Sequence, residues 1–177
     1  MKTIFSGLLA VLLLSSCGST MEVFTDQDKD HSPANYSSYN WQSLTAIENK
    51  ASNPLYYNEL NDKRIRNAVN KELQSRNYAM QEQNGALEVH YHILVEDKLG
   101  SVSESNNSLQ HPLSNLQRVN TFQYRQGTLI IDVMDPKTNT LIWRGWATDI
   151  VGNEARKNPE KAIQQAVKKI FRSFPSR

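Results

Sequence analysis

The segment GTLIIDVMDPKTNTLIWRGWATDIV, residues 127–151, decides the fold. In its first half, apolar side chains recur at every second position, the period of a strand with one buried face: Leu129, Ile131 and Val133. Turn-forming residues follow, namely Asp135, Pro136, Thr138 and Asn139. A second apolar run then carries Trp143 and Trp146. The segment therefore predicts an antiparallel β-hairpin.

Further strands are expected before this hairpin. Residues 86–96, ALEVHYHILVE, alternate clearly between apolar and polar positions, and weaker alternation predicts strands over 21–26 and 39–44. Residues 98–120 are rich in Ser and Asn and have no apolar period, so they predict a long loop.

Two segments have the apolar spacing of helices. In residues 58–76 the spacing follows candidate N-cap residues (Asn58, Asn61 or Asp62), and Asn77 is suited to the left-handed position after the last turn. A second helix begins at Asn158-Pro159 and carries an apolar stripe to Phe174. Each stripe needs a sheet to cover it, so the fold class predicted is α+β, an antiparallel sheet with both helices packed on one face.

The opening of the chain has the pattern of an export signal. Lys2 precedes an apolar run from Ile4 to Leu14, which is shorter than the roughly 20 residues of a membrane-spanning helix. The run ends Leu14-Ser15-Ser16-Cys17, which resembles the bacterial lipobox and implies cleavage before Cys17 and acylation of that residue. The alternative is an ordinary signal with a chance cysteine. The domain plan is a signal peptide over 1–16, a lipidated tether over 17–20 and one α+β domain over 21–177.

The residues after Cys17 bear on which membrane holds the protein. Gly18 occupies the position where an Asp would retain a lipoprotein in the inner membrane of many Gram-negative bacteria. No acidic cluster of the kind seen in surface-export signals follows the cysteine. Attachment to the outer membrane, facing the periplasm, is therefore expected, with fatty acyl chains such as palmitate as the anchor.

Composition excludes some classes of protein. The 177-residue chain is 38% hydrophobic and 21% charged with a net charge of +2, values typical of one soluble domain. A nucleic-acid-binding protein usually carries a dense basic patch, so no nucleic-acid partner is expected. The single cysteine cannot form an internal disulfide.

The chain resembles the domain-of-unknown-function 4136 family of bacterial lipoproteins. The segments that carry the resemblance are NYSSYNW (35–41), RIRNAVNKELQSRNY (64–78), GTLIIDVMDPKTNTLIWRGWA (127–147) and the closing Phe174-Pro175. The sequence departs from the family pattern at Asn40, and Asn77 replaces a common Gly. The resemblance implies an envelope lipoprotein with a compact α+β domain, and it implies no particular activity.

Residues that could carry chemistry are few. His90 and His92 lie on one face of a predicted strand, a spacing that can bind a metal, and His31, His111 and Asp132 are the possible further ligands. Two solvent-facing polar positions are the simpler interpretation, so no metal and no cofactor is expected. Asp132 and Asp135 could suggest acid–base catalysis, but Asp135 starts the turn and Asp132 alternates outward. We expect no enzyme.

The outward face of the predicted sheet is unusually apolar. It would carry Ile130, Met134, Ile142, Arg144, Trp146 and Ile150, with His90, His92 and Leu94. Such a patch needs a cover or a partner, and the cover could be the N-terminal segment or the 98–120 loop. If it is a binding surface, Trp146 and Arg144 would lie at its centre beside Ile142 and Ile130, since Trp and Arg are favoured anchors of interfaces.

The sequence thus favours a non-enzymatic, lipid-anchored periplasmic module that binds another envelope component. The alternative is a small-molecule or metal-binding lipoprotein that uses the His90/His92 face.

Overall fold

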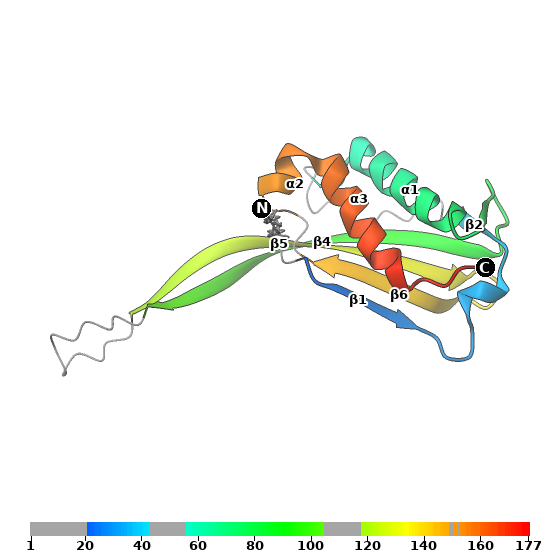
Figure 1. The fold of residues 1–177 in the computed structure, drawn as a ribbon, viewed down its shortest axis with the longest axis horizontal. Coiled ribbons are helices and arrows are strands. Elements are labelled where there is room, and N and C mark those ends of the chain that lie inside the picture. Colours follow the sequence, from blue (N-terminus) through cyan, green and yellow to red (C-terminus); the bar gives the residue numbers. More distant parts are fainter. Residues whose placement is uncertain (1–20, 43–55, 105–117, 149–150, 152) are drawn as a thin grey trace, which may run out of the picture.

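The computed structural model describes residues 21–42, 56–104, 118–148, 151 and 153–177. A six-stranded sheet forms one layer, and helices α1 and α3 form a second layer on one face of it (Figure 1). The predicted α+β fold class is confirmed. The strands are β1 Val23–Gln27, β2 Ser38–Trp41, β3 Ala79–Met80, β4 Leu87–Glu104, β5 Arg118–Asp135 and β6 Thr140–Thr148. The α-helices are α1 Glu59–Gln74, α2 Asn153–Lys157 and α3 Pro159–Ile170, and short 3-10 helices cover Pro33–Asn35 and Phe171–Ser173.

The sheet is mixed. Its order is β1-β6-β5-β4-β2-β3, and β1, β6, β5 and β4 are antiparallel neighbours. β2 runs parallel to β4 and to β3, so the sheet is antiparallel only in its larger part. The Asn70 side-chain oxygen on α1 accepts hydrogen bonds from the Tyr39 hydroxyl at 3.0 Å and from the Trp41 indole N–H at 2.9 Å. These bonds tie β2 to the helix layer.

The helix boundaries follow the expected capping chemistry. The side-chain oxygens of Asn58 and Asn158 accept from the backbone N–H of Asn61 and Lys161, so they are the N-caps of α1 and α3. Asn77 has φ 68° after the end of α1, the left-handed conformation expected for it. None of the described helices is long and apolar enough to span a membrane.

The core lies between the two helices and the sheet. Trp143 is 1% exposed and lies against Phe171 and Phe174, with ring centroids 5.4 and 4.9 Å away. Gly145 lets α3 approach the sheet closely, because a Cβ at this position would come within 2.5 Å of both Trp143 and Ile170. The core residues predicted from the hairpin, Leu129, Ile131, Val133 and Trp143, are all buried.

A β-bulge in the hairpin corrects the position of Ile142. The register pairs Val133 with Trp143 but Met134 with Leu141, so Ile142 is an extra residue in β6. Strict alternation would place Ile142 on the outer face, but the bulge turns it inward and it is fully buried in the core. The prediction that Ile142 belongs to the outer surface was therefore wrong.

Strand replaces the predicted loop at residues 98–104 and 118–120. β4 continues to Glu104 and β5 begins at Arg118, and their paired ends project from the body as a two-stranded ribbon (Figure 1). Residues 105–117 lie outside the described residues. The sequence signal failed because neither side of the ribbon faces a core, so its strands do not alternate. Leu99, 74% exposed, illustrates this.

Buried tyrosines should make the fold sensitive to high pH. Burial raises the pKa of Tyr39 to about 12, and the pKa of Tyr91 is raised further, first by burial and then by its hydrogen bond to Asp62. The unfolded chain loses these protons near pH 10, while the folded state keeps them. We expect the contribution of these tyrosines to the free energy of unfolding to be constant below pH 10 and to fall between pH 10 and about 12. The expected contribution of Tyr39 is about 1–3 kcal/mol, measured by urea titrations across this range.

Tyr39→Phe provides the control for this measurement. The variant loses a hydrogen bond to Asn70, so its stability is lower at neutral pH, but it should lose less of that stability between pH 10 and 12. Equal pH-dependent losses in the two proteins would contradict the assignment to Tyr39.

Candidate functional site

The outer face of the sheet carries an aromatic pair. Trp146 on β6 lies opposite Phe24 on β1, and their rings stack with centroids 5.5 Å apart and 24° between planes. Phe24 is 46% exposed, and Trp146 and Ile130 are partly exposed beside it. Trp146 and Ile130 therefore lie where the sequence predicted, while Ile142 is in the core and Ile150 lies outside the described residues. Phe24, which the sequence analysis did not single out, completes the pair.

An ion pair lies next to these rings. The Arg144 guanidinium donates two hydrogen bonds to the Asp132 carboxylate, at 2.6 and 2.7 Å. Asp132 is only 4% exposed, whereas the Arg144 side chain is 44% exposed, so the arginine covers the carboxylate. The hydrogen bond to Asp132 raises the pKa of Arg144. This bidentate geometry holds Arg144 flat against the sheet, which makes the face more polar than its sequence suggested.

The two histidines of β4 have different partners. His90 Nε2 is 3.5 Å from Glu88 Oε2, is buried and forms no hydrogen bond within the described part of the chain. His92 Nε2 is 3.7 Å from Asp132 Oδ2. Among the described residues no group of three or more His, Cys, Asp or Glu side chains is placed to hold a metal ion. Of the other ligands considered, His31 lies beside Asp28 and His111 is outside the described residues.

Asp132 and Asp135 do not form a catalytic pair. Asp135 accepts hydrogen bonds of 2.8 Å from the Lys137 backbone N–H and from the Tyr36 hydroxyl. These bonds, the backbone one first, lower the pKa of Asp135. Asp135 therefore organises the hairpin turn, while Asp132 holds Arg144.

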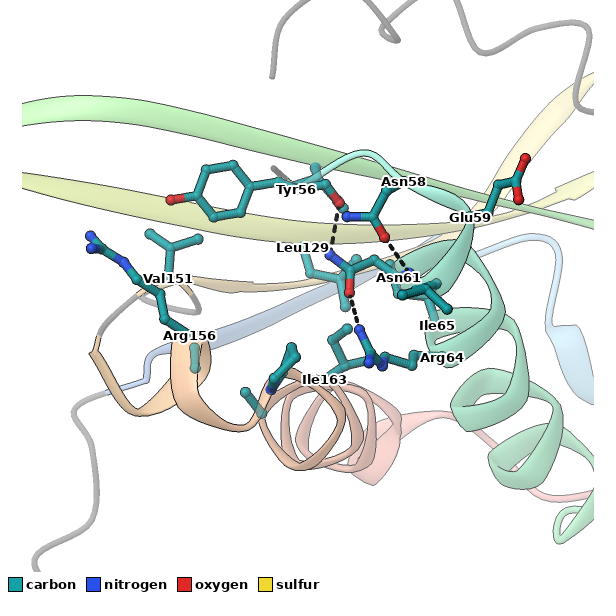
Figure 2. Close-up of a pocket in the computed structure, with 15 residues that line it drawn as sticks. Tyr56, Asn58, Glu59, Asn61, Arg64, Ile65, Leu129, Val151, Arg156 and Ile163 are labelled. Carbon is teal, nitrogen blue, oxygen red and sulfur yellow. Dashed lines mark hydrogen bonds between the residues drawn. The ribbon is translucent and has the colours of Figure 1, made fainter. Parts of the chain in front are cut away.

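A cavity of about 620 Å³ lies on the opposite side of the sheet (Figure 2). It opens between the N-terminal ends of α1 and α3, and α2 forms part of its wall. Ile93 of β4 and Leu129 of β5 provide its floor. The remaining apolar lining residues are Leu60, Ile65, Val151, Ala155, Pro159, Ala162 and Ile163. Its volume falls within the range typical of small-molecule sites.

A few polar side chains line this cavity. Asn61 donates to the Tyr56 backbone carbonyl at 3.1 Å and accepts from Arg64 at 2.8 Å (Figure 2). Arg156, on α2, is exposed and also lines the cavity. The cavity therefore combines apolar walls with two guanidinium groups.

The sequence analysis did not find this cavity. Its lining comes from the segment before α1, from α1, β4, β5, α2 and α3, which are up to 107 positions apart from Tyr56 to Ile163. Each apolar lining residue has the spacing of an ordinary core position. Local periodicity distinguishes buried from exposed positions, but it does not show where side chains of several elements leave a space between the two layers.

The fold is that of a small α+β domain with a cavity between α1 and α3. The chain belongs to the family described as Domain of unknown function (DUF4136), whose family model matches residues 23–176. No match is found among curated protein sequences.

Two solved structures share the fold. A DUF4136 family protein from Bacteroides thetaiotaomicron aligns with TM-score 0.50 and 12% identity, over 87% of this chain and 95% of that one. A PDZ domain protein from Parabacteroides distasonis aligns with TM-score 0.56 and 11% identity over 88% of this chain. The present chain covers 36% of that longer protein. At these identities the similarity establishes the fold alone.

Proposed function

We propose that the protein is a lipid-anchored, non-enzymatic module of the bacterial envelope that binds an apolar small molecule in the cavity between α1 and α3. The observation that carries this proposal is the 620 Å³ cavity with its mainly apolar lining. A hollow of this size between two helices removes contacts that a closed core would keep, so it is a stability cost that a ligand can offset.

A binding role fits the chemistry of the lining better than a catalytic one. The described lining residues include two arginines, one glutamate, one tyrosine and two asparagines, and none of them is His, Cys, Ser, Thr, Asp or Lys. Nucleophilic and general acid–base catalysis usually require a reactive side chain beside its proton-transfer partner. We therefore assign the cavity a role in ligand binding and not in catalysis.

The anchor rests on the sequence at Leu14-Ser15-Ser16-Cys17 and on the resemblance to lipoproteins. Cys17 carries the acyl chains in this proposal, and Gly18, where an Asp would favour retention in the inner membrane, supports attachment to the outer membrane facing the periplasm. An anchored protein of this kind would hold its ligand within reach of the bilayer.

Filling the cavity should abolish ligand binding. Ala162 lines the cavity on α3, so Ala162→Trp places an indole in the space that a ligand would occupy. We expect the full chain to bind the neutral fluorescent probe 1-N-phenylnaphthylamine, and Ala162→Trp to weaken this binding by at least about tenfold. The measurement is a fluorescence titration at low protein concentration.

The matched control is Gln165→Trp, which adds the same side chain at an exposed position of the same helix. This variant should bind the probe like the unmodified chain. If the probe binds to the apolar N-terminal segment and not in the cavity, its binding will persist in Ala162→Trp. Persistent binding in this variant, or a complete lack of binding by the unmodified chain, would overturn the proposal.

The outer sheet face supports a second candidate, docking of an envelope protein. The observation that favours it is the exposed Phe24–Trp146 stack beside Arg144, on the face opposite the helices. Photo-crosslinking in intact cells from a probe at Trp146 or at His92 tests this candidate. One discrete adduct that disappears on Phe24→Glu would support docking, and the absence of any adduct from either position would contradict it.

A further inference from the structure

Two arginines at the cavity lack acidic partners. Neither Arg64 nor Arg156 forms an ion pair with a described residue, and the bond from Arg64 to Asn61 satisfies only one of its donors. Glu59 is the one carboxylate among the lining residues, and its side chain points away from Arg64 in Figure 2. Positive charge at the cavity is therefore not neutralised by the described part of the chain.

Three other charged groups of α1 and α3 have partners within the described residues. Asp62, in the first turn of α1, accepts from Arg66 at 2.9 Å and from the Tyr91 hydroxyl at 2.8 Å. Glu160, in the first turn of α3, accepts from Gln164. Arg76 on α1 is paired with Glu72. Among the described residues, the arginines at the cavity have no such acidic partner.

A buried hydroxyl adds a second polar feature. The Tyr56 hydroxyl is buried and makes no hydrogen bond within the described residues, although Tyr56 lines the cavity. Its charged neighbour is Arg125, whose pKa is raised first by a hydrogen bond to Asp97 and next by the Tyr56 side chain, so this hydroxyl already has a possible partner at the edge of the cavity.

The geometry points to a ligand of definite class: we propose that the cavity binds a single-chain amphiphile with an anionic head group. Its alkyl chain would pack on Ile93, Leu129 and Ile163, and its head would accept hydrogen bonds from Arg64 or from Arg156, which lie on opposite sides of the cavity in Figure 2. A guanidinium matches the oxygens of a carboxylate or a phosphate. This inference rests on the proposed function and adds the charge and shape of the ligand.

Competition among three molecules of equal chain length tests the inference. The full chain is loaded with 1-N-phenylnaphthylamine, and the probe is displaced by dodecanoate, by dodecyl phosphate or by neutral dodecanol, each below its micelle concentration. We expect both anions to displace the probe at about tenfold lower concentration than dodecanol. A preference between the two anions distinguishes a carboxylate ligand from a phosphate ligand.

Charge removal identifies the residues. Arg64→Gln with Arg156→Gln should abolish the advantage of the anions over dodecanol, with each competitor compared against that variant's own affinity for the probe. Arg172→Gln, at an exposed arginine outside the cavity lining, is the matched control and should keep that advantage. A far-ultraviolet circular dichroism spectrum like that of the unmodified chain reports that the variant is folded, and Arg156→Gln alone should at least halve the anion advantage if the double variant does not fold.

The outcomes separate this inference from the proposed function. If the probe binds but dodecanol competes as well as the anions, or the arginine variants keep the anion advantage, the inference is overturned while the cavity remains a binding site. If the unmodified chain binds neither the probe nor any of the three competitors, both the proposed function and the inference are overturned.

Discussion

Trp143→Ala should lower the free energy of unfolding by about 3–5 kcal/mol, the cost typical of truncating a large buried aromatic side chain. Trp143 contacts Phe171 and Phe174 and lies over Gly145, which has no side chain of its own to fill the space left by the indole. The surrounding residues belong to both layers, so the cavity left behind cannot close unless α3 shifts relative to the sheet. Urea titration followed by far-ultraviolet circular dichroism measures the loss.

Trp146→Ala is the matched control for this prediction. Trp146 lies three positions along the same strand but on the outer face, where it is partly exposed and stacks on Phe24. Its replacement should cost less than about 1.5 kcal/mol, since an aromatic pair at a solvated surface contributes about that much. Equal losses for the two tryptophans would show that the outer face is as buried as the core and would contradict the docking candidate.

Cys17→Ser should abolish lipid attachment. The thiol of Cys17 is the only one in the chain, so no other cysteine can take the acyl group in its place. We expect the unmodified chain to incorporate tritiated palmitate and to begin at Cys17 in its mature form. The variant should incorporate none and should retain residues 1–16.

Intact mass measurement and palmitate labelling together check this prediction. Ser19→Ala, two positions after the cysteine, is the control and should be labelled like the unmodified chain. An unmodified chain that is cleaved elsewhere and carries no lipid would show that the segment ending at Ser16 is an ordinary signal, and the anchor would have to be abandoned.

The sequence predicted those parts of the fold that local chemistry determines. The hairpin turn forms at Asp135 because its carboxylate bonds to the Lys137 backbone, and Asn158 and Asn77 occupy the capping positions expected of them. These features depend on residues within a few positions of one another, so a periodic pattern or a cap residue is sufficient evidence.

Features that depend on distant residues were missed. The parallel pairing of β2 with β4 depends on contacts with α1 through Asn70, 29 positions after Trp41. The bulge turns Ile142 toward the core, and the pattern of residue types in β6 does not reveal it. The cavity is lined by residues of α1, α2, α3, β4 and β5, and no single segment encodes how they come together.

The paired outer ends of β4 and β5 form a long ribbon that projects from the sheet. Its outer part, from Glu96 to Glu104 and from Arg118 to Gln126, spans about 30 Å at the usual rise per residue. A ribbon of two strands has no hydrophobic core of its own, so it is stabilised by the larger sheet that it extends. Local unfolding should therefore begin in the outer part of the ribbon and proceed toward the sheet, while the layers around Trp143 stay folded. Substitutions in the outer part of the ribbon should therefore lower the stability of the domain less than substitutions in the core.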